Sequence, residues 1–286
     1  MPELTTPRAL TRTRFELHPS DGGPPVRGDL RVLEGTTPRS AVVICHGFKG
    51  FREWGFFPAV AWAAAARGHA VVSFDLSHNG VGADGVAFSA LDLFEKQTHT
   101  RDLDEIRMVL DAVRGGELLA KKPRRIGVLG HSRGGGEAVL AAAEDGHVDA
   151  LVTWNAIATV HRWRAEQLAR WRHGDRVEIA NARTGELMPI GPGYLRDIEE
   201  NTERLDIRRA AGRLTLPWLI VHGEADTSVP ADDGRALWDM AGENAELLLI
   251  DDADHTFGAK HPYEGATDAL RTATDASLEW FDTHLK

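Results

Sequence analysis

Short runs of apolar residues alternate with longer stretches of helical periodicity along most of this sequence, and this alternation limits the folds open to it. The apolar runs cover residues 41–45, 70–74, 126–129, 150–154, 218–221 and 247–250. Each run is apolar on both faces of an extended chain, which is typical of strands inside a parallel sheet. The stretches between them carry apolar residues at helical spacing and several end in glycine, which predicts helices. These helices are expected at 58–67, 99–113, 137–143, 232–241 and 266–284.

Strands that alternate with helices form right-handed βαβ units. The sequence therefore predicts an α/β fold with a mostly parallel central sheet and helices on both of its faces. Residues 14–18 and 30–33 instead alternate like strands on either side of a turn rich in glycine and proline, which predicts an antiparallel hairpin. A chain of 286 residues lies at the upper end of what one hydrophobic core supports, so we expect a single domain over residues 1–286.

One segment breaks this alternation, because no apolar strand–helix unit occurs between residues 155 and 214. The pattern there indicates a helical stretch at 160–171, a hairpin at 176–190 that turns at 181–185, and a polar helix at 195–209. We interpret this segment, at about 156–213, as a small cap inserted into the domain.

Composition excludes several classes of function. The formal net charge is −10, whereas a surface that binds nucleic acid is basic, so we expect no nucleic-acid partner. No stretch has the roughly 20 apolar residues that cross a bilayer, and the first residues lack the pattern of a signal peptide. We therefore expect a cytoplasmic protein with no membrane partner. Cys45 is the single cysteine and can form no intramolecular disulfide, and no histidines or carboxylates occur at metal-binding spacings, so we predict no metal and no other cofactor.

Residues 130–134, Gly-His-Ser-Arg-Gly, match G-x-S-x-G and fall between a predicted strand and a predicted helix. In that context the serine lies on a sharp turn with its hydroxyl exposed, and its neighbours are small because the strained turn has no room for side chains. The alternative is a glycine-rich strand–helix turn without chemistry. We predict that Ser132 is a nucleophile.

A serine hydroxyl becomes a good nucleophile only when a base removes its proton. His255 is the candidate base, because it closely follows the apolar run at 247–250 and the histidine that serves a nucleophile on such a turn comes late in the chain. His261 and His284 are the alternatives, but neither directly follows a predicted strand.

A carboxylate is then needed to orient the imidazole and to stabilise its charged form. Asp226 follows the apolar run at 218–221, so it lies at the carboxyl end of a predicted parallel strand, where the sites of open α/β sheets collect. The order Ser132, Asp226, His255 is the one expected for a nucleophile on this kind of turn. Glu224 is the nearest alternative to Asp226.

Acyl transfer builds up negative charge on an oxygen, which needs hydrogen-bond donors already in place. Residues 46–50, His-Gly-Phe-Lys-Gly, follow the first apolar run and are similar to the loop that supplies one such backbone N–H. We therefore predict an oxyanion hole formed by the backbone N–H groups of Phe48 and Arg133. A simple turn at the end of the strand is the alternative.

The candidate substrate pocket includes His131 beside the nucleophile, and Trp163 and Trp171 in the expected cap. With the arginines around them, the tryptophans would stack on an aromatic substrate and bind a carboxylate. We favour the simpler interpretation, an amphipathic helix with buried tryptophans and solvated arginines. Residues 80–85 spell G-x-G-x-x-G, but they follow a later strand and open no clear helix, so we interpret them as a loop rather than a nucleotide site.

Residues 46–50, 130–135 and 222–230, completed by His255, together resemble the α/β-hydrolase superfamily. Within it they resemble the cinnamoyl- and feruloyl-esterase-like enzymes, near the dienelactone hydrolases and the catalytic domains of prolyl oligopeptidases. The resemblance runs from about residue 40 to the C-terminus. It implies the α/β-hydrolase fold, a small lid where the cap falls, and esterase activity. Dienelactone hydrolases have a nucleophilic cysteine where this sequence has Ser132, and oligopeptidases carry a large propeller that it lacks.

The sequence therefore predicts a serine carboxylesterase that hydrolyses small carboxylic esters, with aromatic or hydroxycinnamoyl-type esters among the candidates. A serine peptidase, which the likeness to oligopeptidases suggests, a thioesterase or a lactonase would use the same residues. A non-enzymatic binding protein on a hydrolase scaffold is the alternative from another class. A small-molecule ester is the expected partner, and we leave open whether the protein forms a homodimer.

Overall fold

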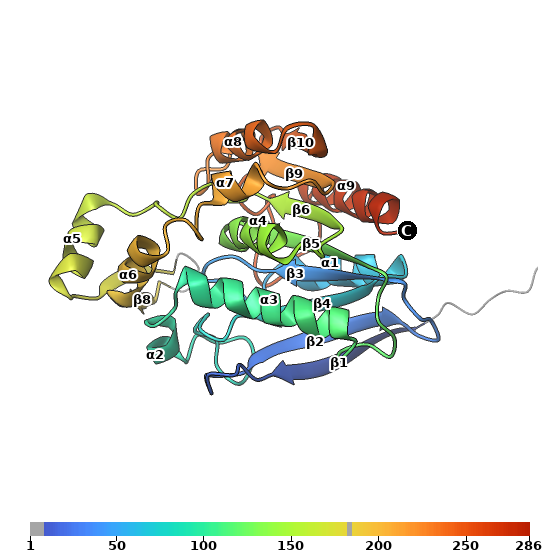
Figure 1. Ribbon diagram of the computed structural model, residues 1–286, viewed down its shortest axis with the longest axis horizontal. Helices are drawn as coiled ribbons and strands as arrows, with labels where there is room; N and C mark the ends of the chain where they lie inside the picture. Colours follow the sequence, from blue (N-terminus) through green and yellow to red (C-terminus); the bar gives the residue numbers. More distant parts are fainter. Residues whose placement is uncertain (1–8, 182–184) are drawn as a thin grey trace, which may run out of the picture.

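The protein is built around an eight-stranded sheet, in a computed structural model that describes residues 9–181 and 185–286. The strands span Leu10–Leu17 (β1), Val26–Leu33 (β2), Ser40–Cys45 (β3), Ala70–Asp75 (β4), Arg125–His131 (β5), Ala150–Trp154 (β6), Trp218–Gly223 (β9) and Ala245–Ile250 (β10). They lie in the order β1-β2-β4-β3-β5-β6-β9-β10 (Figure 1). β2 pairs antiparallel with both β1 and β4, and all other neighbours pair in parallel. The predicted hairpin and the predicted, mostly parallel sheet are thus confirmed.

Helices cover both faces of this sheet, as the sequence predicts. They span Phe57–Ala66 (α1), His99–Gly115 (α3), Arg133–Asp145 (α4), Ala231–Ala241 (α8) and Asp268–His284 (α9), with a short 3₁₀ turn at Gly242–Asn244. The short helix Leu91–Phe94 (α2) instead packs against residues Leu187–Ile190 (β8). Buried side chains of α3, α4 and α8 form one core and those of α1 and α9 form the other. The alternation along β3 shows why both cores are needed: Ala41 and Val43 face the first, and Val42 and Ile44 face the second.

The strand order creates a switch point at β3, since the chain runs from β3 to β4 on one side and returns to β5 on the other. In open α/β sheets a crevice forms at this point, at the carboxyl ends of the strands. Cys45, the last residue of β3, pairs with Gly130 of β5. The loop at residues 46–50 and the turn around Ser132 therefore begin side by side.

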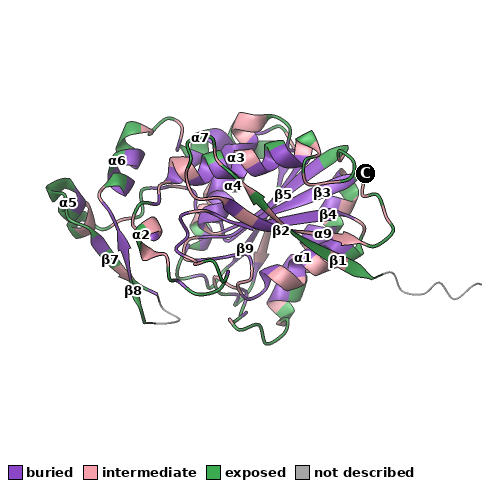
Figure 2. Ribbon diagram, turned by 90° about the horizontal axis from the view of Figure 1, so that it is seen from below, coloured by how far each residue is buried: buried purple, intermediate pink, exposed green. Residues whose placement is uncertain are grey.

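Most of the chain between β6 and β9 stands away from the sheet in both ribbon views, while the short helix at its end lies on the body of the molecule (Figures 1 and 2). The elements of this segment span Ala165–His173 (α5), Val177–Ala180 (β7), Leu187–Ile190 (β8), Gly193–Glu200 (α6) and Ile207–Ala211 (α7). β7 and β8 form the antiparallel hairpin expected at 176–190, and of its predicted turn, residues 182–184 lie outside the described residues.

Two boundaries in this segment differ from the expectation. The helix expected at 160–171 begins only at Ala165, and the residues before it form an irregular segment in which Val160, Arg162 and Trp163 line a pocket. The polar helix expected at 195–209 is two helices, since Asp206 accepts a hydrogen bond from the backbone N–H of Arg209 and so caps a new helix, α7. α7 packs against α4 and α8 on the body of the molecule. Within the described residues, no helix is both long and apolar enough to cross a membrane.

Candidate active site

Ser132 lies on the turn between β5 and α4, in the strand–turn–helix context that the motif predicts. Its backbone has φ 58° and ψ −124°, a conformation that strains a residue with a side chain. The flanking glycines are required, because a Cβ on Gly134 would overlap the carbonyl oxygen of His46 and one on Gly130 would crowd α4. The strained turn therefore holds the hydroxyl of Ser132 above the sheet.

The structure brings the three predicted residues Ser132, His255 and Asp226 together. Nε2 of His255 lies 2.9 Å from Oγ of Ser132, and Nδ1 lies 2.7 Å from Oδ2 of Asp226. Burial alone would raise the pKa of Asp226, but the hydrogen bonds from His255 and from two backbone N–H groups lower it below its usual value. An ionised Asp226 accepts the hydrogen of Nδ1, which leaves Nε2 free to accept the hydrogen of the serine hydroxyl.

The alternative residues lie elsewhere. Glu224 pairs with Arg235 on the surface. Nδ1 of His261 accepts a hydrogen bond from the backbone N–H of Gly55. The ring of His284 packs on Trp280 in the last helix.

The predicted oxyanion loop lies directly against Ser132. A Cβ on Gly47 would lie 2.8 Å from Cβ of Ser132, so this position requires a glycine. Among the described residues, neither the backbone N–H of Phe48 nor that of Arg133 donates a hydrogen bond to another protein group. Two donors are therefore free beside Ser132, as an oxyanion hole requires.

The side chain of Arg133 has a role that the sequence analysis did not assign. Its guanidinium is buried, donates to Asp102, to Glu137 (2.8 Å) and to Gln97 (2.8 Å), and lies 5.6 Å from the ring centroid of Phe48. Burial raises the pKa of Asp102 well above its usual value, while the charge of Arg133 opposes this shift. The only signal in the sequence was local, an Arg and a Glu four residues apart on one helix.

This ion cluster extends to the cap. The ring of Tyr194 in α6 lies on the other side of Arg133, with its centroid 5.3 Å from the guanidinium carbon. Its hydroxyl lies 2.7 Å from Nε2 of His99, whose Nδ1 lies 2.9 Å from Oε1 of Glu137. One buried polar network thus joins the helix after Ser132 to the cap, and the ring of Phe48 in the candidate oxyanion loop packs against it.

His131 and Asn155 hold the loop that carries His255. Nε2 of His131 and Nδ2 of Asn155 each donate to the backbone oxygen of His255, both at 2.9 Å. Oδ1 of Asn155 accepts from the backbone N–H of Gly223, 2.8 Å away, next to the loop of Asp226. Asn155 is fully buried and has a positive φ of 47°, which asparagine tolerates better than most residues. It therefore links the loops of His255 and Asp226 to the strand beside Ser132.

Replacing Asn155 with alanine should lower both stability and activity. The change leaves the N–H of Gly223 without its buried partner, so the free energy of unfolding should fall by about 1–3 kcal/mol in urea titrations. Because the loop of His255 loses one of its two supports, kcat/KM for a short ester should fall about tenfold or more. Asn201→Ala, which removes a hydrogen bond within the cap, is the control and should keep kcat/KM. Destabilised Asn155→Ala protein with full kcat/KM would exclude a positioning role.

Comparison with known proteins gives the same architecture. Residues 40–176 match the family model described as the alpha/beta hydrolase fold. The "Uncharacterized 31.7 kDa protein in traX-finO intergenic region" of Escherichia coli is 25% identical over 90% of this chain and 95% of its own length. The structure of Est1E from Butyrivibrio proteoclasticus with ferulic acid bound is 22% identical, covers 96% of each chain and has a TM-score of 0.65. Dienelactone hydrolase from Anabaena variabilis is 18% identical over 96% of this chain and 99% of its own, with a TM-score of 0.60. This chain has the α/β-hydrolase fold.

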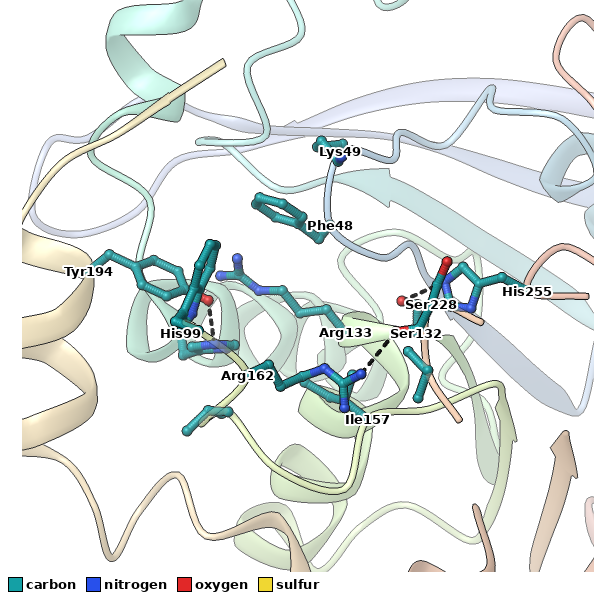
Figure 3. Close-up of a pocket in the computed structure, with 13 residues that line it drawn as sticks. Phe48, Lys49, His99, Ser132, Arg133, Ile157, Arg162, Tyr194, Ser228 and His255 are labelled. Carbon is teal, nitrogen blue, oxygen red and sulfur yellow. Dashed lines mark hydrogen bonds between the residues drawn. The ribbon is translucent and has the colours of Figure 1, made fainter. Parts of the chain in front are cut away.

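Two cavities of this α/β-hydrolase fold open on either side of the candidate nucleophile. The larger, about 330 Å³, is lined by Ser132, His255, Phe48 and Arg133 and by the cap residues Trp163 and Tyr194 (Figure 3). The smaller, about 230 Å³, shares Ser132, His255 and Phe48 and is bounded by Trp54, Phe57 and His131. Phe48, Ser132 and His255 thus stand between two spaces.

The candidate pocket residues fall in three different places around these cavities. Trp163 lines the larger one and His131 lines the smaller. Trp171 lines neither, because it is buried behind Trp163 and its Nε1 donates to the backbone oxygen of Ile190. The described residues contain no cluster of three or more histidine, cysteine or acidic side chains that could hold a metal ion.

Proposed function

We propose that this protein is a serine carboxylesterase that hydrolyses small carboxylic esters through an acyl-enzyme. The observation that carries the proposal is the bonded chain from Oγ of Ser132 to His255 (2.9 Å) and on to Asp226 (2.7 Å), beside two free backbone N–H groups. This arrangement can activate a hydroxyl and stabilise an oxyanion in the same place.

Each group has one task in the proposed reaction. Oγ of Ser132 attacks the ester carbonyl while Nε2 of His255 takes the hydroxyl proton, and Asp226 stabilises the imidazolium that forms. The carbonyl oxygen becomes an oxyanion that accepts hydrogen bonds from the backbone N–H groups of Phe48 and Arg133. His255 then donates the proton to the departing alcohol. Water, deprotonated by the same imidazole, releases the acid and restores the serine.

The cavities favour esters with small groups on both sides of the carbonyl. A volume of about 330 Å³ lies at the lower end of the range for small-molecule sites. The rings of Phe48, Trp163 and Tyr194 line it, and such walls suit an aromatic acyl group. The ferulic acid in the similar Est1E structure makes hydroxycinnamoyl esters sensible members of a test panel.

A fluorophosphonate probe tests this proposal, because it forms a covalent adduct with an activated serine. The native protein should take up one probe molecule at Ser132, located by peptide mass spectrometry, and should then lose hydrolysis of short para-nitrophenyl esters. Heat-denatured protein is the control and should remain unlabelled. If the protein is labelled but hydrolyses only amides or thioesters, the assignment of the nucleophile stands and the proposed substrate class is wrong. If the native protein takes up no probe and hydrolyses no member of the panel, the result would favour the alternative hypothesis of a non-enzymatic binding protein.

A further inference from the structure

The larger cavity differs in charge from the chain as a whole. The protein has 43 acidic and 33 basic residues, with a formal net charge of −10. Yet among the described residues, the ones that line this cavity include three cationic side chains, Lys49, Arg133 and Arg162, and no aspartate or glutamate. A site with this lining attracts anions even on an acidic protein.

Two of the three cations are already paired with protein carboxylates. Arg133 pairs with Asp102 and Glu137. Arg162 pairs with Asp233 at 2.6 Å and also donates to the backbone oxygen of Ser228. Their charges are balanced within the fold, so neither needs an anion from the substrate.

Lys49 is different, because no ion pair joins its ammonium to a carboxylate anywhere in residues 9–181 and 185–286. Its Nζ donates to the backbone oxygen of Ala180 (3.1 Å) and lies 5.6 Å from the ring centroid of Phe48. The side chain is half-buried, which lowers its pKa because the charged form loses solvent. A partly desolvated ammonium with an unused hydrogen-bonding capacity is a binding site for an anionic group.

Lys49 belongs to the loop that packs against Ser132. Lys49 follows the candidate oxyanion donor Phe48 and has φ 57°, a left-handed conformation that is strained for a lysine. It lines both cavities that meet at Ser132 (Figure 3 shows the larger). An anion bound by Lys49 would therefore lie within one small substrate of the ester carbonyl.

We propose that the preferred substrate is an ester that carries a carboxylate, and that Lys49 binds this carboxylate. The inference rests on the esterase function proposed above and narrows it to acidic esters. Lys49 acts here as a point charge, so it selects for negative charge rather than for one fixed geometry. The preference should weaken as ionic strength rises, since the ammonium is only half-buried.

Matched esters that differ only in charge test this proposal. The mono-para-nitrophenyl ester of adipic acid and its terminal amide place the group on the acyl side, and para-acetoxybenzoate and para-acetoxybenzamide place it on the alcohol side. For at least one pair, kcat/KM of the acid should exceed that of the amide by about tenfold or more. In Lys49→Met this ratio should fall to about one, and Lys49→Arg should restore most of it. The ratio cancels any general damage to the oxyanion loop, because both esters of a pair use that loop.

Lys260→Met is the matched control, because Lys260 is exposed and pairs with Glu264 outside both cavities, and it should keep the wild-type ratio. If Lys49→Met is too slow for kinetics, calorimetric binding of each pair to Ser132→Ala with and without Lys49→Met gives the same comparison. Equal rates for acid and amide in the wild type, or a preference that survives Lys49→Met, would overturn the role of Lys49 and leave the esterase proposal intact. A different measurement tests the esterase proposal itself, because that proposal fails if the fluorophosphonate does not label the protein.

Discussion

Replacing Ser132 with alanine should lower kcat/KM for a short para-nitrophenyl ester by about 10⁴-fold or more. Oγ of Ser132 is the atom that would bond to the ester carbonyl, and it is the hydrogen-bond partner of His255 at 2.9 Å. Alanine has no atom to take that place. The two free backbone N–H groups and the cavity remain, so a small rate above that of water should persist. Initial rates at low substrate concentration measure the loss.

The Ser132→Ala substitution should leave the stability of the protein almost unchanged. Alanine keeps the Cβ of the turn, and the lost hydrogen bond joins only half-exposed side chains, so the melting temperature should stay within about 2 °C. Ser228→Ala is a matched control, because Ser228 lines the same cavity and would not react, and its kcat/KM should stay within about threefold of wild type. Hydrolysis by Ser132→Ala at close to the wild-type rate would refute the assignment of the nucleophile.

Much of this fold could be predicted because its signals are local. The runs at 41–45 and 126–129 are apolar at every position, and that pattern has few explanations other than a strand with both faces covered. The residues after such strands then meet at one edge of the sheet, whatever the details of the packing. Ser132, Asp226 and His255 could therefore be placed together from their positions after three runs, and the structure brings them within hydrogen-bonding distance.

The parts that could not be predicted depend on contacts between distant residues. The charge of Arg133 is balanced by Asp102 from another helix, and nothing in either local sequence indicates that pair. Asn155 acquires its role from a positive φ and from bonds to two loops far along the chain. The single helix expected at 195–209 is two helices for a related reason, because α7 packs against α4 and α8, and the local sequence does not show these contacts.

The predicted effect of Asp226→Asn follows from the hydrogen bonds of its two carboxylate oxygens. Oδ1 accepts from the backbone N–H groups of Ser228 (2.8 Å) and Val229 (2.9 Å), so the oxygen of an asparagine must occupy that position. The amide nitrogen then replaces Oδ2 and faces Nδ1 of His255, 2.7 Å away. Because this nitrogen donates rather than accepts, the imidazole must carry its hydrogen on Nε2.

That tautomer cannot take the proton of Ser132, so kcat should fall by about 10³ to 10⁴-fold while KM changes little. Steady-state kinetics with a short ester measure the two constants separately. Glu224→Gln, a charge change in the same loop at a residue paired with Arg235 on the surface, should leave both constants within about threefold. A decrease in kcat of less than tenfold in Asp226→Asn would mean that His255 does not depend on this carboxylate for its tautomer. The base would then have to be oriented through its backbone by Asn155 and His131 alone.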